Sequence, residues 1–493
     1  MAIRKISARK GSSSKPASRS AAARKSNPEK RSEPLSGEHR EFLSNALLTL
    51  NTGFEHLPAF KNDVPGSQRL GDVLTATAER LRDNYPYFHP LYAGQMLKPP
   101  HPVAQLAYTL AMTINPNNHA LDGGRATSAM EKEAVAQIAA MFGWTKFLGH
   151  LCGGGTMANL EALWVAGQSA SGKTILASSQ SHYTHERISK VLQLPFETIP
   201  SDARGRINLK LLEKRLTHRD VGTVVVTMGT TAIGSVDPLH EILALRTRYN
   251  FRVHADAAYG GYFTLLENLE PETQMAFAAM GHADSIAIDP HKHGLQPYGC
   301  GCILFKDPAA GRWYKHNSPY TYFTSNDLHL GEISLECSRP GAAAVALWAT
   351  QTLLPLTKRG KFAHGLAQGR EAARTLHDRL HADKRFITPF APELDIVIFA
   401  LRAESLSTAS LLSRQIFDAA AKRDLHLALA DLPTDLFPNL PPNMNRDRQT
   451  ITCLRSVLMK PAHFDWLDQI WQRILLSVDD VQNAKTTISN SSK

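Results

Sequence analysis

Two runs of the chain each place a charged side chain directly after a short apolar strand: Val253-His254-Ala255-Asp256 and Ser285-Ile286-Ala287-Ile288-Asp289-Pro290-His291-Lys292. At the carboxyl edge of an open α/β sheet, such side chains point into the crevice where ligands bind. A carboxylate buried there is costly without a cationic partner, and a protonated ring nitrogen can be that partner. An amine held away from water at the next strand end can act as a nucleophile. We therefore predict that Asp256 and Lys292 face a common ligand.

Short apolar strands alternate with helical runs through the middle of the chain, as in Thr174–Ala177 followed by His182–Leu194. This alternation predicts an α/β fold with a mainly parallel sheet that helices cover on both faces. After the helical run Ala342–Leu354, strands and helices mix, which predicts a smaller C-terminal α+β domain. Residues 84–120 are rich in Pro, Asn and His and are expected to be irregular. The expected organisation is a disordered basic tail over 1–37, a helical segment over 38–120, a large α/β domain over 121–355 and a small α+β domain over 356–485.

A glycine-rich turn, Cys152-Gly153-Gly154-Gly155-Thr156, leads straight into a helical run. Glycines let a ligand approach the backbone closely, and the unpaired N–H groups of a helix N-terminus attract phosphate. Such a turn is as often a plain connector, and this one lacks the lysine of a P-loop. His182 stands at another predicted helix start, where capping or core packing is the commoner role and stacking on a flat ring is the functional one.

Each of these elements alone has an ordinary explanation, for example Asp256 as a cap or metal ligand and Lys292 as a surface lysine. All four occur in a consistent order within one α/β unit, and that combination favours a binding site for a flat, phosphate-bearing ring. No metal site is predicted.

The formal charge of +10 is confined to the amino-terminal tail. Residues 1–31 hold ten Lys or Arg and one acid, Glu29, so they carry +9, and the remaining 45 basic and 44 acidic residues leave +1. The tail lacks apolar periodicity and is expected to be disordered, with a transit peptide or a loose polyanion contact as the alternative. The nearly neutral body argues against specific nucleic-acid binding, and no apolar run is long enough to cross a membrane. Five cysteines without a Cys-x-x-Cys pair predict no disulfide framework and a reducing, cytoplasmic location.

With these residues in view, the chain resembles the group II amino-acid decarboxylases that depend on pyridoxal 5'-phosphate (PLP), over most of residues 80–480. The most specific parts are Asp256-Ala257-Ala258 and Asp289-Pro290-His291-Lys292. The resemblance implies the fold type I, aspartate-aminotransferase-like architecture of PLP-dependent transferases. It also implies that Lys292 carries PLP as a Schiff base, that Asp256 contacts the pyridine nitrogen and that His182 stacks on the ring. The cofactor contacts implied in this way are Lys292, Asp256, His182, Gly154, Gly155, Thr156, Thr227, Thr230 and His291.

A closer resemblance is to the bacterial tyrosine decarboxylase branch. It rests on His89–Met96, Asn115–Ala120 and Gly294–Tyr298, and it implies a homodimer with active sites at the subunit interface. Residues 38–120 then contribute to dimerisation and to the substrate wall. The chain departs from the family's usual phosphate turn, Thr-Ser-Gly-Gly-Thr, because Cys152 and Gly153 take the first two places. The substrate contacts implied are His89, Asn118, His119 and Tyr298.

The predicted reaction is the decarboxylation of an L-amino acid, aromatic and tyrosine-like, to the amine and CO2. The resemblance implies a loop tyrosine as proton donor to Cα, and Tyr320 is preferred over Tyr322 on spacing, with packing as their ordinary role. An acidic substrate, aspartate or glutamate, is the first rival and would need a cationic group, for which Arg125, Arg339 and Arg455 are available. Further rivals are another fold type I PLP lyase or aminotransferase, and a non-catalytic PLP-fold protein with a polyanion-binding tail. The predicted catalytic residues are Lys292, Asp256, His182 and Tyr320.

Overall fold

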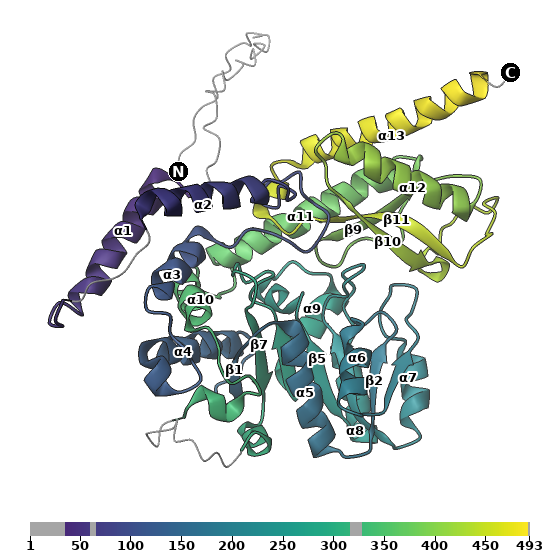
Figure 1. Cartoon of the computed structure of the whole chain (residues 1–493). Helices are drawn as coiled ribbons and strands as arrows, with labels where there is room; N and C mark the ends of the chain where they lie inside the picture. Colours follow the sequence, from purple (N-terminus) through teal and green to yellow (C-terminus); the bar gives the residue numbers. More distant parts are fainter. Residues whose placement is uncertain (1–34, 60–65, 316–327, 492–493) are drawn as a thin grey trace, which may run out of the picture.

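The computed structural model describes residues 35–59, 66–315 and 328–491. Within them the chain forms two sheets, one in each of two domains that lie against each other (Figure 1). The larger sheet is built from residues 148–305 and the smaller from residues 386–457. The predicted α/β fold with a mainly parallel sheet and a smaller α+β domain is confirmed.

The large sheet has seven strands in the order β1-β7-β6-β5-β4-β2-β3. All run parallel except β7, which pairs antiparallel with both β1 and β6. The interior strand β4 reads VGTVVVT and is buried along its whole length, as expected for a β-branched strand covered on both faces. The strands are β1 (Leu148–Cys152), β2 (Thr174–Ser178), β3 (Phe196–Ile199), β4 (Val221–Thr227), β5 (Arg252–Asp256), β6 (Ser285–Ile288) and β7 (Gly301–Phe305).

Helices cover this sheet, and further helices pack beside it. Helix α5 packs against β6 and β7, and α10 packs against α3 and α4. Residues 84–120 were expected to be irregular, and α3 corrects that expectation, because its run of Ala and Leu follows Pro102 at the first helical turn. The helices are α3 (Pro102–Met112), α4 (Arg125–Met141), α5 (Gly155–Ser169), α6 (Thr184–Val191), α7 (Leu209–Leu216), α8 (Leu239–Tyr249), α9 (Pro271–Ala278) and α10 (Gly341–Leu353).

The smaller domain is an antiparallel sheet in the order β10-β11-β9-β8 with three long helices. Helix α12 packs on β11 and β9, and α13 packs on α12. Ser405 caps α12 by accepting from the backbone N–H of Thr408 at 3.1 Å. The elements are β8 (Phe386–Ile387), β9 (Ile396–Leu401), β10 (Ala428–Pro433), β11 (Thr450–Val457), α11 (Lys361–Ala382), α12 (Leu406–Ala421) and α13 (Leu467–Ser491).

Buried polar contacts join the two domains. Arg206 of the large domain donates through Nε to Glu393 Oε1 at 2.9 Å, and Glu393 Oε2 accepts from the backbone N–H of Val236 at 3.0 Å. From the other side, the buried Arg370 on α11 donates to the carbonyl oxygen of Asn268 at 2.7 Å. The domain joint is therefore made of paired charges and satisfied hydrogen bonds.

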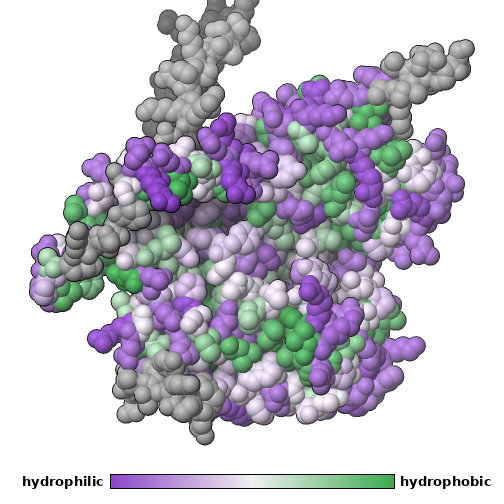
Figure 2. Space-filling view, viewed as in Figure 1, coloured by the Kyte–Doolittle hydropathy of each residue, from purple (hydrophilic) through white to green (hydrophobic). Residues whose placement is uncertain are grey.

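Two amino-terminal helices, α1 (Gly37–Thr52) and α2 (Ser67–Leu81), lie outside this body (Figure 1). Helix α1 confirms the helical pattern expected from residue 38, but it buries none of its residues. Large apolar side chains of both helices stand in the open, and Figure 2 shows hydrophobic groups on this part of the surface. They are Phe42, Leu48, Leu70, Val73, Leu74 and Leu81, each about half exposed or more.

The remaining expectations from composition have mixed outcomes. All five cysteines are free, as predicted. None of the helices in the described part of the chain is both long and apolar enough to cross a bilayer. The basic tail over residues 1–31 lies outside the described residues.

Candidate active site

The ends of the parallel strands and the loops that follow them meet at one edge of the large sheet. Thr227 ends β4 and Asp256 ends β5, and the two residues are paired directly across these strands. The chain leaves β6 at Ile288 and reaches Lys292 four residues later. A cavity of about 500 Å³ opens at this edge. Eight of the residues predicted to bind the cofactor line it: Gly154, Gly155, Thr156, His182, Thr227, Asp256, His291 and Lys292.

Asp256 is held in the cavity wall by a buried histidine. His185 Nε2 donates to Asp256 Oδ2 at 2.8 Å, and the backbone N–H of Ala258 donates to Oδ1 at 3.2 Å. Burial alone would raise the pKa of Asp256, but the hydrogen bond and the charge of His185 hold it well below its usual range. The residue therefore presents a carboxylate to the cavity.

Lys292 faces an acid of its own segment. Its Nζ lies 3.0 Å from Asp289 Oδ2, and Asp289 is almost fully buried. Sequence reasoning placed Lys292 at the end of an apolar strand and named no partner for it; in the structure the turn after β6 brings positions 289 and 292 together. The pair fixes the amine at the cavity wall.

The glycine-rich turn has the geometry of an anion cradle. Gly154 has φ +144°, a conformation that favours glycine, and the first intrahelical hydrogen bond of α5 runs from Ala158 N–H to the Gly154 carbonyl at 3.0 Å. The N–H groups ahead of Ala158 are therefore free of intrahelical partners. A Cβ on Gly155 would lie 2.7 Å from Asp289 Oδ2, so a larger residue would collide with the lysine's partner.

Two features of this turn were not foreseen from the sequence. Glu336 Oε2 accepts from the backbone N–H of Gly153 at 2.9 Å and so places an acid beside the cradle. The Cys152 thiol, which replaces the hydroxyl of the family pattern, contacts the carbonyl oxygen of Gly154 at 3.5 Å. Burial raises the pKa of Cys152 well above its usual range, so the residue stays a neutral thiol.

Small and flat groups shape the rest of the cavity. His182 lines it, and its Nδ1 also accepts from the backbone N–H of Thr184, the first residue of α6, at 3.3 Å. Burial lowers the pKa of His182, which keeps the ring neutral. Ala258 lines the cavity with little bulk. Thr230 lies outside the lining, and its hydroxyl accepts from Ser235 N–H at 3.0 Å in a turn.

These groups fit PLP on independent grounds. The cradle offers N–H donors to a phosphate, the carboxylate of Asp256 suits a protonated ring nitrogen, and Lys292 supplies an amine. The hydroxyl of Thr227 is buried in the cavity wall and has no hydrogen-bond partner among the described residues. A ring oxygen of the cofactor is a suitable partner for that orphaned hydroxyl.

Comparison with known proteins gives the family. A model described as the pyridoxal-dependent decarboxylase conserved domain matches residues 72–402, more than half of the chain and all of the cavity lining. The chain belongs to the pyridoxal-dependent decarboxylases. It therefore uses PLP and decarboxylates an amino acid.

Individual relatives of this decarboxylase differ in the substrate that their names give. An L-tyrosine decarboxylase of Levilactobacillus brevis is 27% identical over 461 residues, covering 71% of this chain and 73% of its own length. An L-aspartate decarboxylase of Thermococcus kodakarensis is 28% identical over 281 residues, covering 56% and 71%. Among solved structures, mouse CSAD has a TM-score of 0.72 at 18% identity, covering 90% of this chain and 99% of that chain. Oryza sativa TDC with PLP and tryptamine has a TM-score of 0.70 at 17% identity, covering 91% and 99%. These structures confirm the fold type I architecture.

The residues predicted to contact substrate lie apart from the cofactor cavity of the single decarboxylase chain. His89 packs its ring edge against Trp466, with 4.8 Å between centroids. Asn118 is fully buried and donates to Glu131 Oε2 at 2.7 Å. Within one chain, both residues have structural partners.

The other two residues predicted to contact substrate are His119 and Tyr298. The carbonyl oxygen of His119 accepts from Gly331 N–H at 2.9 Å. Tyr298 is more than half exposed, its hydroxyl donates to the Met96 carbonyl at 3.1 Å, and its ring lies 4.7 Å from that of His291. Because His291 lines the cavity, Tyr298 is joined to the site by this ring contact.

The arginines that an acidic substrate would need are not in the cavity lining. Arg339 is buried and pairs with Glu131 Oε1 at 3.0 Å, and Arg125 lies exposed at the start of α4. Arg455 is buried near the site, but it donates to the carbonyl oxygens of Thr231 at 2.7 Å and Ala232 at 3.0 Å. Tyr320 and Tyr322 lie outside the described residues.

Proposed function

We propose that this pyridoxal-dependent decarboxylase acts on aromatic L-amino acids, tyrosine first. The observation that carries the proposal is the charge of the cavity lining. Lys292, the predicted cofactor lysine, is its one Lys or Arg among the described residues, and Glu336 adds a negative charge. Burial lowers the pKa values of His182 and His291, so neither supplies a cation at neutral pH. An acidic side chain would find no partner there, whereas an uncharged aromatic ring needs none.

Each cavity residue has a proposed task in the reaction. Lys292 binds the cofactor through its amine, and Asp256 stabilises the positive charge on the pyridine nitrogen. When bound, PLP supplies the electron sink for the electrons of the broken Cα–carboxylate bond. His182 and Ala258, which both line the cavity, would pack against the bound cofactor and help to orient the substrate so that the Cα–carboxylate bond can break and CO2 leave.

Substrate preference is tested by kcat/KM for tyrosine, phenylalanine, aspartate and glutamate, measured as amine and CO2 released. Tyrosine is expected to give the highest value. Aspartate is the second candidate because a relative is named for it, and a higher kcat/KM for aspartate than for tyrosine would overturn the proposal. In that event, loss of aspartate turnover in Arg455→Met would identify the missing cation.

We also propose that Tyr320 delivers the proton that replaces CO2 on Cα. A phenol can transfer a proton in a site that excludes bulk water. Tyr320→Phe is expected to bind PLP and substrate normally and to release amine roughly 10²–10⁴ times more slowly. Tyr322→Phe is the matched control, and normal amine release by Tyr320→Phe would remove Tyr320 from the mechanism.

A homodimer is the third part of the proposal. Its support is the exposed apolar stripe of α2, where Leu70, Val73, Leu74 and Leu81 recur at helical spacing on one face. A second copy of the chain can cover this stripe and bring substrate contacts towards the partner's cavity. Sedimentation is expected to give twice the 54.3 kDa of the chain, and a monomer at micromolar concentration would contradict it.

A further inference from the structure

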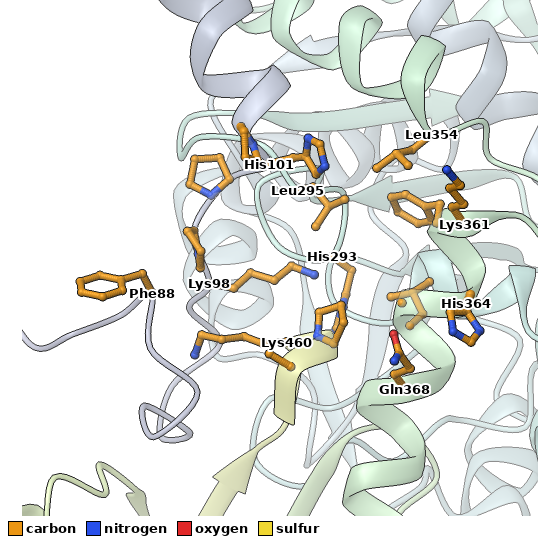
Figure 3. A pocket seen from close by; sticks show the side chains of 18 residues that line it. Phe88, Lys98, His101, His293, Leu295, Leu354, Lys361, His364, Gln368 and Lys460 are labelled. Carbon is orange, nitrogen blue, oxygen red and sulfur yellow. The ribbon is translucent and has the colours of Figure 1, made fainter. Parts of the chain in front are cut away.

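A second cavity, of about 440 Å³, lies between the two domains and shares no lining residue with the cofactor cavity. Its walls come from the loop before α3, the loop after Lys292, the start of α11 and the turn Pro461–His463 (Figure 3). Four elements far apart in sequence therefore enclose one space. The predicted reaction makes no use of it.

The Lys, Arg, Asp and Glu side chains that line this second cavity are all cationic among the described residues. Lys98, Lys361 and Lys460 line it, and its lining contains no Asp or Glu among the described residues. Lys460 is buried, and its Nζ donates to the Tyr92 carbonyl at 2.5 Å. Lys98 has only a long contact with the Met459 carbonyl, 3.4 Å from its Nζ, among the hydrogen bonds of the described residues. Lys98, which is partly buried, is less satisfied than the buried Lys460.

Asp395, whose negative charge favours the protonated form of Lys98, is already engaged. Asp395 accepts from the Tyr259 hydroxyl at 2.5 Å, and its Oδ2 lies 3.3 Å from His293 Nε2. No carboxylate of the described residues forms an ion pair with Lys98 within 4.0 Å. Burial lowers the pKa of Lys98 to about 8, so the amine is mostly charged at pH 7. Partial removal from water disfavours a cation that has no adjacent anion, and an anionic ligand would reduce that cost.

Figure 3 shows Lys98 extending into the cavity towards His293. Around it the walls are apolar, with Leu295, Phe362 and Leu366 among the lining residues together with several prolines. A ligand that suits both features has one anionic head and an apolar body. Amines, the product class of the reaction, carry the wrong charge for this space.

We propose that the second cavity binds a small monocarboxylic acid with an aromatic or branched aliphatic body, with the carboxylate paired to Lys98. The second cavity is connected to the cofactor cavity through the chain and through side-chain contacts. His293 directly follows Lys292 in the chain, and its ring lies 4.7 Å from the ring of Tyr259, which lines the cofactor cavity. The ligand therefore contacts the segment that carries the cofactor lysine.

Calorimetric titration of the full-length, PLP-loaded protein tests the proposal with three probes of one shape: 3-phenylpropionate, 3-phenylpropan-1-ol and 3-phenylpropylamine. The acid is expected to bind at least tenfold more tightly than the alcohol, and the amine, which resembles the product of the proposed reaction, is expected to bind only in competition with the amino-acid substrate. Equal binding of acid and alcohol, or no binding of the acid, overturns the proposal.

Variants locate the bound acid. Lys98→Met is expected to weaken 3-phenylpropionate binding at least tenfold, Lys98→Arg to retain most of it, and the matched control Lys361→Met to change it less than threefold, because Lys361 is exposed at the cavity rim. An unchanged affinity in Lys98→Met overturns the assignment, as does an equal loss in Lys361→Met, which would indicate a diffuse electrostatic effect. The cofactor absorbance of each variant checks that the fold is intact.

A labelling experiment covers the case in which Lys98→Met fails to fold. A diazirine derivative of 3-phenylpropionate is photolysed with the unmodified, PLP-loaded protein, and the labelled peptides are mapped. Label on residues 98–102 or 460–462 supports the proposal. Label confined to the lining of the cofactor cavity, or spread over the surface, overturns it.

Discussion

Two regions differ in how far a single chain provides partners for their side chains. They are the edge of the large sheet that holds Asp256 and Lys292, called here the cofactor edge, and the two amino-terminal helices. At the edge, Asp256 has His185 and Lys292 has Asp289, all from the same chain. In α1 no residue is buried, and α2 leaves a stripe of large apolar side chains in water. One chain therefore supplies the partners of both charged residues at this edge, while large apolar side chains of its amino-terminal helices stay exposed. Chemistry and assembly are thus expected to respond to different substitutions.

Removing the predicted cofactor lysine should show the largest difference between the two regions, because it should abolish turnover and leave the assembly unchanged. Lys292→Ala is expected to lower turnover roughly 10⁴-fold or more, because a covalent contact and the orientation that it provides are both lost. The visible absorbance of the bound cofactor should vanish, while the sedimentation coefficient stays that of the parent. Lys190→Ala, at an exposed site, is the control. Borohydride fixation of the cofactor on another lysine of the parent protein would contradict the assignment.

Neutralising the acid of the cofactor edge should have the next largest effect. Asp256→Asn keeps the side-chain volume but loses the charge that stabilises the ring nitrogen, so turnover should fall on the order of 10²–10³-fold. PLP affinity, measured by absorbance titration, should fall as well. Near-parental turnover would show that the ring nitrogen needs no anion in this protein.

Charging the apolar stripe should break the assembly and spare the cofactor. The double variant Val73→Asp, Leu74→Asp is expected to weaken dimerisation roughly 100-fold or more, since two carboxylates would be buried without partners. Thr75→Asp, also exposed on α2, is the matched control. PLP should remain bound in both variants. A dimer that survives the double change would place the subunit interface elsewhere.

The smallest expected effect concerns the partner of Asp256. His185→Leu removes a hydrogen bond to a charged group, which corresponds to about tenfold weaker PLP binding. His185→Gln keeps a donor and should stay within about threefold of the parent. If both variants bind PLP like the parent, His185 is a packing residue without influence on Asp256.

Much of the fold was predictable because its signals are local. The strand Ser285–Ile288 has the boundaries that its apolar run predicts, and the strand expected over Thr174–Ala177 extends by only one residue, to Ser178. Strand β3 was missed, since its sequence FETI is short and half polar and it forms only by pairing along β2. Helix α3 was missed because proline-rich flanks hid its periodicity.

The site was predictable in part. Asp256 and Lys292 could be predicted because they are charged residues directly after apolar strands. The glycine turn could be predicted because three consecutive glycines precede a helical run. His185 and Glu336 could not be found in this way, because their roles depend on contacts 71 and 183 positions away along the chain. The placement of Thr230 in a turn depends likewise on tertiary structure, and the domain bounds, the substrate contacts and Tyr320 stay predictions.

The buried contact between Arg206 and Glu393 bears on how the enzyme moves. Swinging the small domain away would strand a guanidinium and a carboxylate without partners, at a cost of several kcal/mol. A large hinge motion in every catalytic cycle is therefore disfavoured, and the two domains act as one rigid frame. Agents that slow large-scale motion by raising solvent viscosity are therefore expected to leave turnover unchanged.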